Sequence, residues 1–164
     1  MDKDGCFVRQ RCMCSTLFHA VLSQNFKIYI MHVRLIVGVD ITSCQNLNGM
    51  LRADLNSVRL PDDINWKKLC VKIPAQVTIS EKYDDKVKIY TASMKLLTKD
   101  VVPNCGRFAF RIHLSDGKCR LIGTNERPYP VVSKQENMPD SVKDNQLDEV
   151  TITYSSTYPI PYII

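Results

Sequence analysis

Apolar and polar side chains alternate along much of the chain from residue 32 onward, which is the period of a β-strand. In the first alternating segment, one face of the predicted strand carries Val33, Leu35, Val37, Val39 and Ile41. The opposite face carries His32, Arg34, Gly38 and Asp40, with Ile36 as the apolar exception. The pattern predicts a strand with one buried face.

The same alternation returns in residues 69–73, 77–79 and 86–98. It is clearest in 148–155, where Val150, Ile152 and Tyr154 are predicted to face inward. In 86–98 the apolar parity changes near Ile89-Tyr90, which predicts a β-bulge or a strand that passes between two sheets. Residues 48–63 show no clear period, so a short helix or an irregular cover is expected there, and Pro61-Asp62-Asp63 could cap a turn of helix at 64–69.

The strongest turn signal is Asp116-Gly117, because it lies between two alternating segments. It predicts a hairpin with a two-residue type I′ turn. In that register Leu114 pairs with Cys119 and Ile112 pairs with Leu121, so the apolar faces coincide. The opposite, polar face then gathers Arg111, His113 and Arg120.

These segments predict a mainly β protein. We expect an antiparallel β-sandwich or barrel with at most one or two short helices, in a single β domain over residues 31–157. Residues 123–130 are expected to be a loop because two prolines remove backbone donors, and 133–147 are expected to be a polar, exposed loop.

Residues 1–30 differ from the rest of the chain, with three of the seven cysteines and only two acidic residues. Their apolar stretch, 17–22, is too short for a membrane span, and the segment makes a poor signal peptide. Two explanations are open for this doubtful extension. Either Met31 is the natural start and 1–30 is upstream sequence, or the segment is an arm that orders on a partner.

Composition narrows the range of functions. The net charge of +5 comes from 22 Lys and Arg against 17 Asp and Glu, and acids are mixed with lysines in 81–88. This mixing is typical of a solvated strand face, so we expect neither a nucleic-acid partner nor a membrane. The odd number of cysteines, without regular spacing, indicates reduced thiols in a reducing compartment.

No known catalytic motif is present. The chain lacks a Gly-rich phosphate loop, a His-Glu-x-x-His motif and a nucleophile elbow. His113 has no carboxylate partner that the sequence identifies, and Cys119 is expected to be a core thiol. We therefore expect no catalytic residues, no cofactor, no metal and no enzyme activity.

The Pro-rich segment 158–164 contains two Pro, two Tyr and three Ile. A monomer is not expected to leave such a segment in water. We expect it to pack on its own domain, the favoured alternative, or to dock on another subunit as an extended strand.

The run 118–132, Lys-Cys-Arg-Leu-Ile-Gly-Thr-Asn-Glu-Arg-Pro-Tyr-Pro-Val-Val, is followed by the Thr-rich segment Val150-Thr-Ile-Thr-Tyr154. This pattern resembles small proteins of bacterial prophages and related elements, in which a strand ending in Leu-Ile-Gly precedes a loop with an acidic residue, Pro and an aromatic. The segment that ends in Thr-Ser-Cys44 resembles their start. The resemblance implies a virion component of the tail or head–tail region, in the bacterial cytoplasm or the virion, with no enzyme activity.

The leading hypothesis is a phage or prophage structural protein that assembles with its own copies or with other virion proteins. Its predicted interaction surface comprises Arg111, His113, Arg120, Glu126, Arg127, Tyr129, Tyr158, Ile160 and Tyr162. The alternative is a ligand- or nucleic-acid-binding β-barrel with a basic hairpin face made of Arg107, Arg111, His113 and Arg120.

Overall fold

A computed structural model of the protein describes residues 34–164, except 104, 137 and 139–146. The expectations for residues 1–30 and for His32 and Val33 lie outside the described residues. Residues Arg34–Ile164 form one compact unit made of two β-sheets. The prediction of a mainly β sandwich is confirmed, and the helix in the described part is the single 3-10 turn η1 (Cys44–Leu47).

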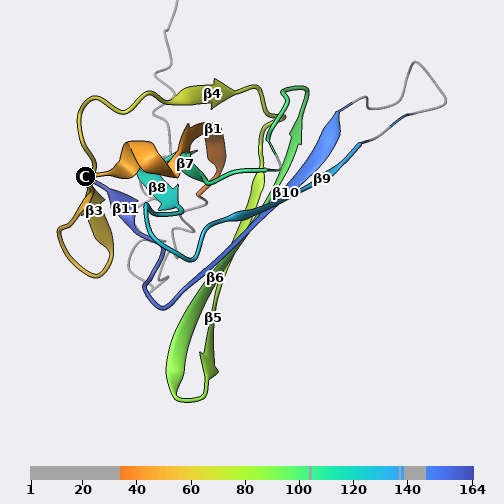
Figure 1. Ribbon diagram of the computed structural model, residues 1–164. Helices are drawn as coiled ribbons and strands as arrows, with labels where there is room; N and C mark the ends of the chain where they lie inside the picture. Colours follow the sequence, from red (N-terminus) through yellow and green to blue (C-terminus); the bar gives the residue numbers. More distant parts are fainter. Residues whose placement is uncertain (1–33, 104, 137, 139–146) are drawn as a thin grey trace, which may run out of the picture. The chain divides into compact units, whose positions relative to one another are not determined.

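The larger sheet has seven strands in the order β2-β3-β11-β8-β7-β1-β4 (Figure 1). All neighbours pair antiparallel except β11 and β3, which are parallel. The bounds are β1 (Ile36–Ser43), β2 (Leu51–Arg52), β3 (Ser57–Arg59), β4 (Lys67–Leu69), β7 (Phe108–Leu114), β8 (Cys119–Ile122) and β11 (Tyr162–Ile163).

The smaller sheet has four antiparallel strands in the order β5-β6-β10-β9 (Figure 1). Its strands are β5 (Gln76–Asp84), β6 (Val87–Thr98), β9 (Val131–Gln135) and β10 (Asp148–Ser156). The predicted inward face of β10 is confirmed, since Val150, Ile152 and Tyr154 are all buried.

The main core lies between the two sheets. Strand β7 contributes Phe110 and Ile112, and strand β6 contributes Met94 and Leu96, all fully buried because alternate residues of each strand face the other sheet. A second, smaller apolar cluster forms on the other face of the larger sheet. Its buried members are Cys44, Leu47, Val58, Ala109 and Leu121.

A β-bulge in β1 changes the predicted parity of this strand. Ile36 pairs with Leu114 and Gly38 pairs with His113, so Val37 is an extra residue without a partner in β7. As a result Ile36 belongs to the core, whereas Leu35 and Val37 are 47% and 46% exposed. The prediction that Leu35 and Val37 share the buried face of Val39 and Ile41 is therefore wrong.

Of the two alternatives for residues 48–63, the structure shows an irregular cover with the short strands β2 and β3, and Met50 and Leu60 pack on the second apolar cluster. The turn of helix expected at 64–69 is wrong, since strand β4 lies there. A further local prediction is also wrong. Strand β6 has no bulge near Ile89, because its pairing with β5 runs unbroken from Val87 to Lys95. The apolar parity changes because Val87 and Ile89 lie on the outer side of the strand, near the exposed end of the hairpin.

The hairpin between β7 and β8 has a three-residue loop instead of two. The amide of Leu114 donates to the carbonyl of Lys118 at 2.9 Å, and Gly117 has a φ of 79°, which suits a loop that ends in a left-handed glycine. His113 therefore pairs with Cys119, and Ile112 pairs with Arg120.

Because of this one-residue difference, each side chain of β8 projects to the face opposite the one predicted. Arg120 lies on the same side as the core-facing Ile112, and Cys119 lies beside His113 on the outer side. The shifted register costs no apolar burial, because Leu121 packs into the second cluster and Ile122 into the main core.

Residues 158–164 pack on their own domain, as the favoured alternative predicted. Strand β11 inserts between β3 and β8, and Ile160 is buried in the main core. The phenol oxygen of Tyr162 accepts a hydrogen bond from Arg120 at 2.6 Å. This segment completes the larger sheet and does not extend away from it.

Gly123 follows β8 with a φ of 102°, and a Cβ there would lie 2.8 Å from Pro130 and 3.2 Å from the backbone of Ala109. We expect Gly123→Ala to lower the free energy of unfolding by about 2–4 kcal/mol, from backbone strain plus a steric clash. The matched control is Gly117→Ala, which has a similar positive φ but open space around the added methyl. It should cost about 1 kcal/mol in urea unfolding. Equal losses for the two variants would contradict the tight packing at Gly123.

Candidate functional site

The residues of the predicted hairpin surface lie on two different faces. Arg111 and His113 are on the outer face of β7, whereas Arg120 faces the opposite way and pairs with Ile112. Arg107 shares the outer face but stacks on the ring of Tyr129 at 4.8 Å. The basic hairpin face of the alternative hypothesis is therefore not formed.

The loop residues of the predicted surface are only partly accessible. Glu126 and Arg127 are exposed, and Tyr129 is half-buried against the second apolar cluster. The hydroxyl of Tyr129 accepts a hydrogen bond from Arg107 at 3.3 Å. The contact between Arg107 and Tyr129 fixes the loop to the start of β7.

The predicted residues of the 158–164 segment also separate. Tyr158 is exposed and stacks with the guanidinium of Arg52, and Tyr162 is half-buried. Ile160 is only 3% exposed, so its predicted place in an interaction surface is wrong. Its side chain packs in the main core and is not accessible to a partner.

Arg34 and Arg120 converge on Tyr162 at one end of the sandwich. Their guanidinium groups donate to the Tyr162 hydroxyl at 2.8 Å and 2.6 Å. Beside them a groove of about 470 Å³ runs between β5 and the core-facing side of β7 and β8, with Ile112 and Val77 among its walls. The groove is open and mostly apolar, with basic side chains at its rim.

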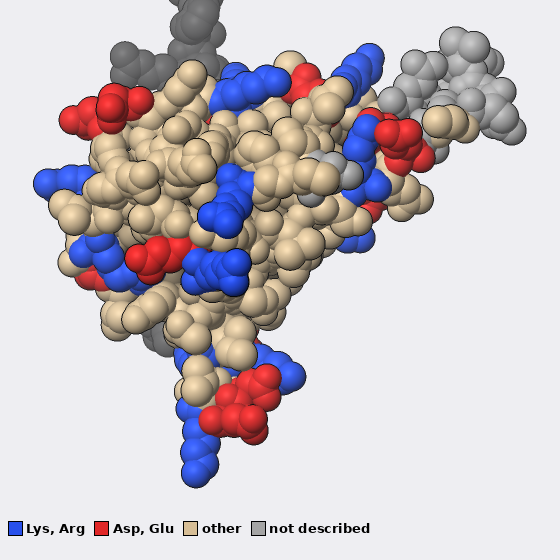
Figure 2. Space-filling model, viewed as in Figure 1, with Lys and Arg blue, Asp and Glu red and all other residues tan. Residues whose placement is uncertain are grey.

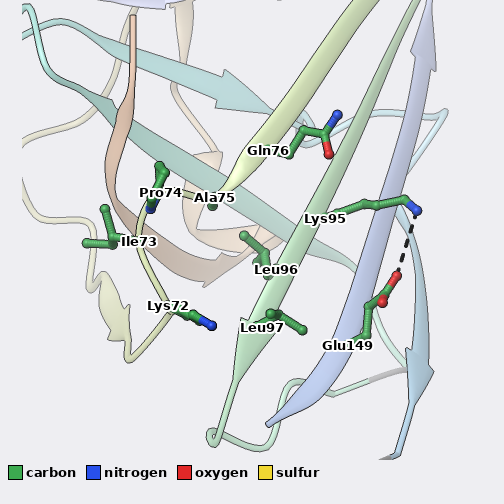
Figure 3. A pocket seen from close by; sticks show the side chains of 9 residues that line it. All are labelled: Lys72, Ile73, Pro74, Ala75, Gln76, Lys95, Leu96, Leu97 and Glu149. Carbon is green, nitrogen blue, oxygen red and sulfur yellow. Dashed lines mark ion pairs between the residues drawn. The ribbon is translucent and has the colours of Figure 1, made fainter. Parts of the chain in front are cut away.

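A second hollow of about 310 Å³ lies where the segment before β5 crosses β6 (Figure 3). Lys95 and Glu149 form an ion pair at 3.8 Å along its wall, and Ile73 and Pro74 lie on the other side. Its lining contains no histidine or cysteine. It offers no set of groups for catalysis.

The densest cluster of reactive side chains lies on the outer face of the larger sheet. Strand pairing places Asp40 opposite Arg111, and His113 opposite Cys119. Because side chains of paired residues project to the same face of a sheet, all four meet above β1, β7 and β8. We call Asp40, Arg111, His113 and Cys119 the outer-face cluster.

Asp40 is the anchor of the outer-face cluster. Its Oδ2 atom accepts hydrogen bonds from Arg111 Nε and Nη2 at 2.9 Å and 2.6 Å, and lies 2.7 Å from His113 Nε2. Burial raises the pKa of this carboxyl, but the hydrogen bonds and charges of His113 and Arg111 outweigh burial and hold the pKa below its usual value. Asp40 is therefore an ionised acceptor.

Where the His113 ring is neutral, the ionised Asp40 sets its tautomer. A carboxylate can only accept, so Nε2 carries the proton and donates it to Asp40. The other ring nitrogen, Nδ1, is then an acceptor, and it lies 3.3 Å from the sulfur of Cys119. With this tautomer, the thiol of Cys119 donates to His113, which donates to Asp40.

The arrangement is a relay and not a metal site. The carboxylate and the sulfur lie at opposite nitrogens of one imidazole ring, so they cannot converge on one ion. Accordingly, no group of three or more potential ligands among the described His, Cys, Asp and Glu residues could hold a metal ion.

The surroundings of the outer-face cluster limit its mobility. The guanidinium of Arg111 stacks on the ring of Trp66 at 4.6 Å, and Trp66 packs into the second apolar cluster. His113 lies against Gly38, whose missing side chain leaves room for the ring. Packing on two sides therefore fixes the positions of the polar groups.

Sequence reasoning found His113 and Arg111 but missed Asp40 as their partner. Asp40 is 73 residues away from His113, and no local spacing connects them. The available signal was a lone acid on the polar face of the first predicted strand. Only the pairing of β1 with β7 shows which residue it meets.

A different exposed feature is the free end of the β5–β6 hairpin. Ile79, Tyr83 and Tyr90 project to the same side as the core residues of this sheet, as the pairing of Val77 with Met94 shows. Yet Ile79 is 37% and Tyr83 72% exposed. We call these three residues the hairpin ledge.

Charged side chains lie among the residues of the hairpin ledge, because Glu81 pairs with Tyr90 and Lys88 pairs with Tyr83 on the same face. Figure 2 shows basic and acidic groups together at the projecting end of the hairpin. Lys88 forms an ion pair with Glu81, and its ammonium lies 5.1 Å from the Tyr90 ring centroid. The Glu81 hydrogen bond, the largest contribution, raises the pKa of Lys88, so the ammonium stays charged.

Asp40→Asn tests the anchor role of the carboxylate. The change leaves the half-buried Arg111 without its counter-charge, so we expect a loss of about 2–4 kcal/mol in the free energy of unfolding at neutral pH. Asp62→Asn, on an exposed loop, is the matched control and should change stability by less than about 0.5 kcal/mol. Urea unfolding measures both.

The same variant should alter the pH dependence of stability. The folded-state pKa of Asp40 lies below its unfolded value of about 3.9, so its contribution is complete above that pH and is lost as the pH falls through the folded pKa. Asp40→Asn should therefore differ most from wild type at neutral pH and approach it in acid. A constant difference between the two proteins at all pH values would contradict the assignment.

Comparisons with known proteins returned no relative. No protein-family model, curated protein or solved structure matches the chain. In the described residues, no helix is long and apolar enough to cross a membrane. The function is therefore inferred from the placement of the side chains described above.

Proposed function

We propose that the protein is a non-enzymatic structural protein that assembles with its own copies through the β5–β6 hairpin. The observation that carries the proposal is the hairpin ledge. Its side chains lie on the core-facing side of the smaller sheet, but Ile79 and Tyr83 are exposed instead of buried between the sheets. Apolar side chains on such a surface gain free energy when a partner removes them from water.

The geometry of the hairpin supports this role. Strand β10 pairs with β6 only as far as Tyr90, so the last three pairs of the hairpin, from Lys82 to the turn at Asp85 and Lys86, form a two-stranded projection. An isolated two-stranded hairpin is only marginally stable in water, and a partner would stabilise this end. Among the described strands, β5 lies at the edge of its sheet, beside β6. Its outer edge therefore offers backbone groups to another chain.

The partner is proposed to be a second copy because the charges around the ledge are of both signs. Lys82 and Lys86 stand beside Glu81 and Asp84 on one hairpin, so two copies can place opposite charges together. A partner with a single strong charge would gain little from such a mixture.

The setting of a phage or prophage virion, in the tail or head–tail region, rests on the resemblance of residues 118–132 and 150–154. The buried Leu121-Ile122-Gly123 strand end and the Pro-bounded loop after it carry that resemblance. Genes for other virion proteins beside this one would support the setting, and a metabolic operon would argue against it.

Light scattering coupled to size-exclusion chromatography, over a series of concentrations, tests assembly. We expect oligomers of the full-length protein, and at least about tenfold weaker association for Ile79→Ser combined with Tyr83→Ser, because the loss of buried apolar area weakens an interface. Ser80→Ala with Lys82→Ala changes the opposite side of β5 and is the matched control.

The controls separate assembly from folding. Both double variants should keep the wild-type melting temperature, because the substituted side chains are exposed. A full-length protein that stays monomeric at every concentration would contradict self-assembly. Oligomers that tolerate the ledge variant but not the control variant would assign the contact to the other side of the strand.

A further inference from the structure

We propose that Cys119 is a site of reversible thiol–disulfide exchange with small disulfides, in which His113 accepts the thiol proton and Asp40 positions His113. The site is independent of the hairpin ledge and of assembly. It rests on a chain of hydrogen-bond contacts across three neighbouring strands, from Cys119 on β8 to His113 on β7 and Asp40 on β1.

The first step of the argument is the direction of the hydrogen bonds. Asp40 is an acceptor, so the proton of the neutral His113 ring lies on Nε2, and Nδ1 faces the Cys119 sulfur with a free lone pair at 3.3 Å. This is the geometry in which an imidazole removes a proton from a thiol, because a base needs hydrogen-bond reach before anything else.

The second step is access. Cys119 and His113 are both partly exposed among the described residues. Cys44, in contrast, is 1% exposed in the second apolar cluster, where burial raises its pKa to about 11. A disulfide in solution can therefore reach Cys119 but not Cys44.

The third step is the charge around the thiol. Burial raises the pKa of Cys119, Arg111 lowers it, and Asp40 and Asp116 raise it, with a net upward shift. The resting thiol is therefore neutral, and its reactivity depends on proton removal during the attack. Only the thiolate attacks a disulfide, so a neutral thiol must lose its proton before or during the attack. His113 is the group placed to accept that proton.

The exchange is balanced in atoms and electrons. The Cys119 proton passes to His113 Nδ1 as the sulfur attacks one sulfur of a small disulfide, so one S–S bond forms and one breaks. The leaving sulfur departs as a thiolate and takes the proton from His113. Cys119 is oxidised to a mixed disulfide, and the leaving group is reduced to a thiol.

The test is site-resolved reaction of the full-length chain with hydroxyethyl disulfide, which is uncharged and does not respond to Arg111. Peptide mass spectrometry follows each cysteine. In wild type at neutral pH, Cys119 should react at least as fast as the more exposed Cys70 and Cys105. A rate below both, as its lower exposure alone would give, overturns the proposal without any variant.

His113→Gln keeps a side chain that can donate to Asp40 but removes the base. We expect the rate at Cys119 to fall about tenfold or more, while Cys70 and Cys105 serve as internal controls with unchanged rates. An unchanged rate at Cys119 in a variant that melts like wild type overturns the role of His113.

The pH profile distinguishes a base from a structural support. Without the base, the rate should follow the thiolate fraction and rise about tenfold per pH unit below the thiol pKa, whereas the wild-type rate should rise less steeply. Asp40→Asn should steepen the wild-type profile toward that of His113→Gln, since it frees the ring tautomer. Parallel profiles for all three proteins would contradict the relay.

Discussion

Strand β7 is buried along its core side and, at Ala109, on its outer side as well, and the rest of the described structure depends on this constraint. Phe110 and Ile112 face the smaller sheet, while Ala109 faces the second apolar cluster. A strand that must satisfy two apolar environments fixes the register of both neighbours, because a slip of one residue would exchange its faces. The bulge at Val37 and the three-residue loop before β8 are the local adjustments that this register requires.

The alternation of apolar residues was enough to predict the fold class and the inward face of β10. It was not enough to predict β8, where Leu121 and Ile122 are adjacent and both buried. In a strand with two buried faces, alternation no longer says which face is which, so the two-residue turn gave an equally consistent pairing. The Val37 bulge left one sign in the sequence, the apolar Ile36 on the polar face, but apolar residues at 33, 35 and 37 kept the simple alternation equally consistent.

The outer-face cluster illustrates a similar limit for sites. Arg111 and His113 alternate with core residues and were recognised as polar positions, but their acidic partner comes from β1, far away in the sequence. The ion pair of Arg111 with Asp40 also removes charge that the sequence suggested for a basic face. A charged residue on a predicted strand therefore says little about its surface potential until the neighbouring strand is known.

The position of β11 affects the order in which the protein can fold. Strands β2 and β3 come early in the chain, but among the described strands β3 joins the larger sheet through β11. There the amide of Tyr162 donates to the carbonyl of Asn56, and that of Ile164 donates to the carbonyl of Val58. During synthesis the β2–β3 pair must therefore wait for residues more than a hundred positions later. Long-range closure of this kind slows folding, and it leaves Val58 and the surrounding apolar cluster uncovered until the late strand arrives.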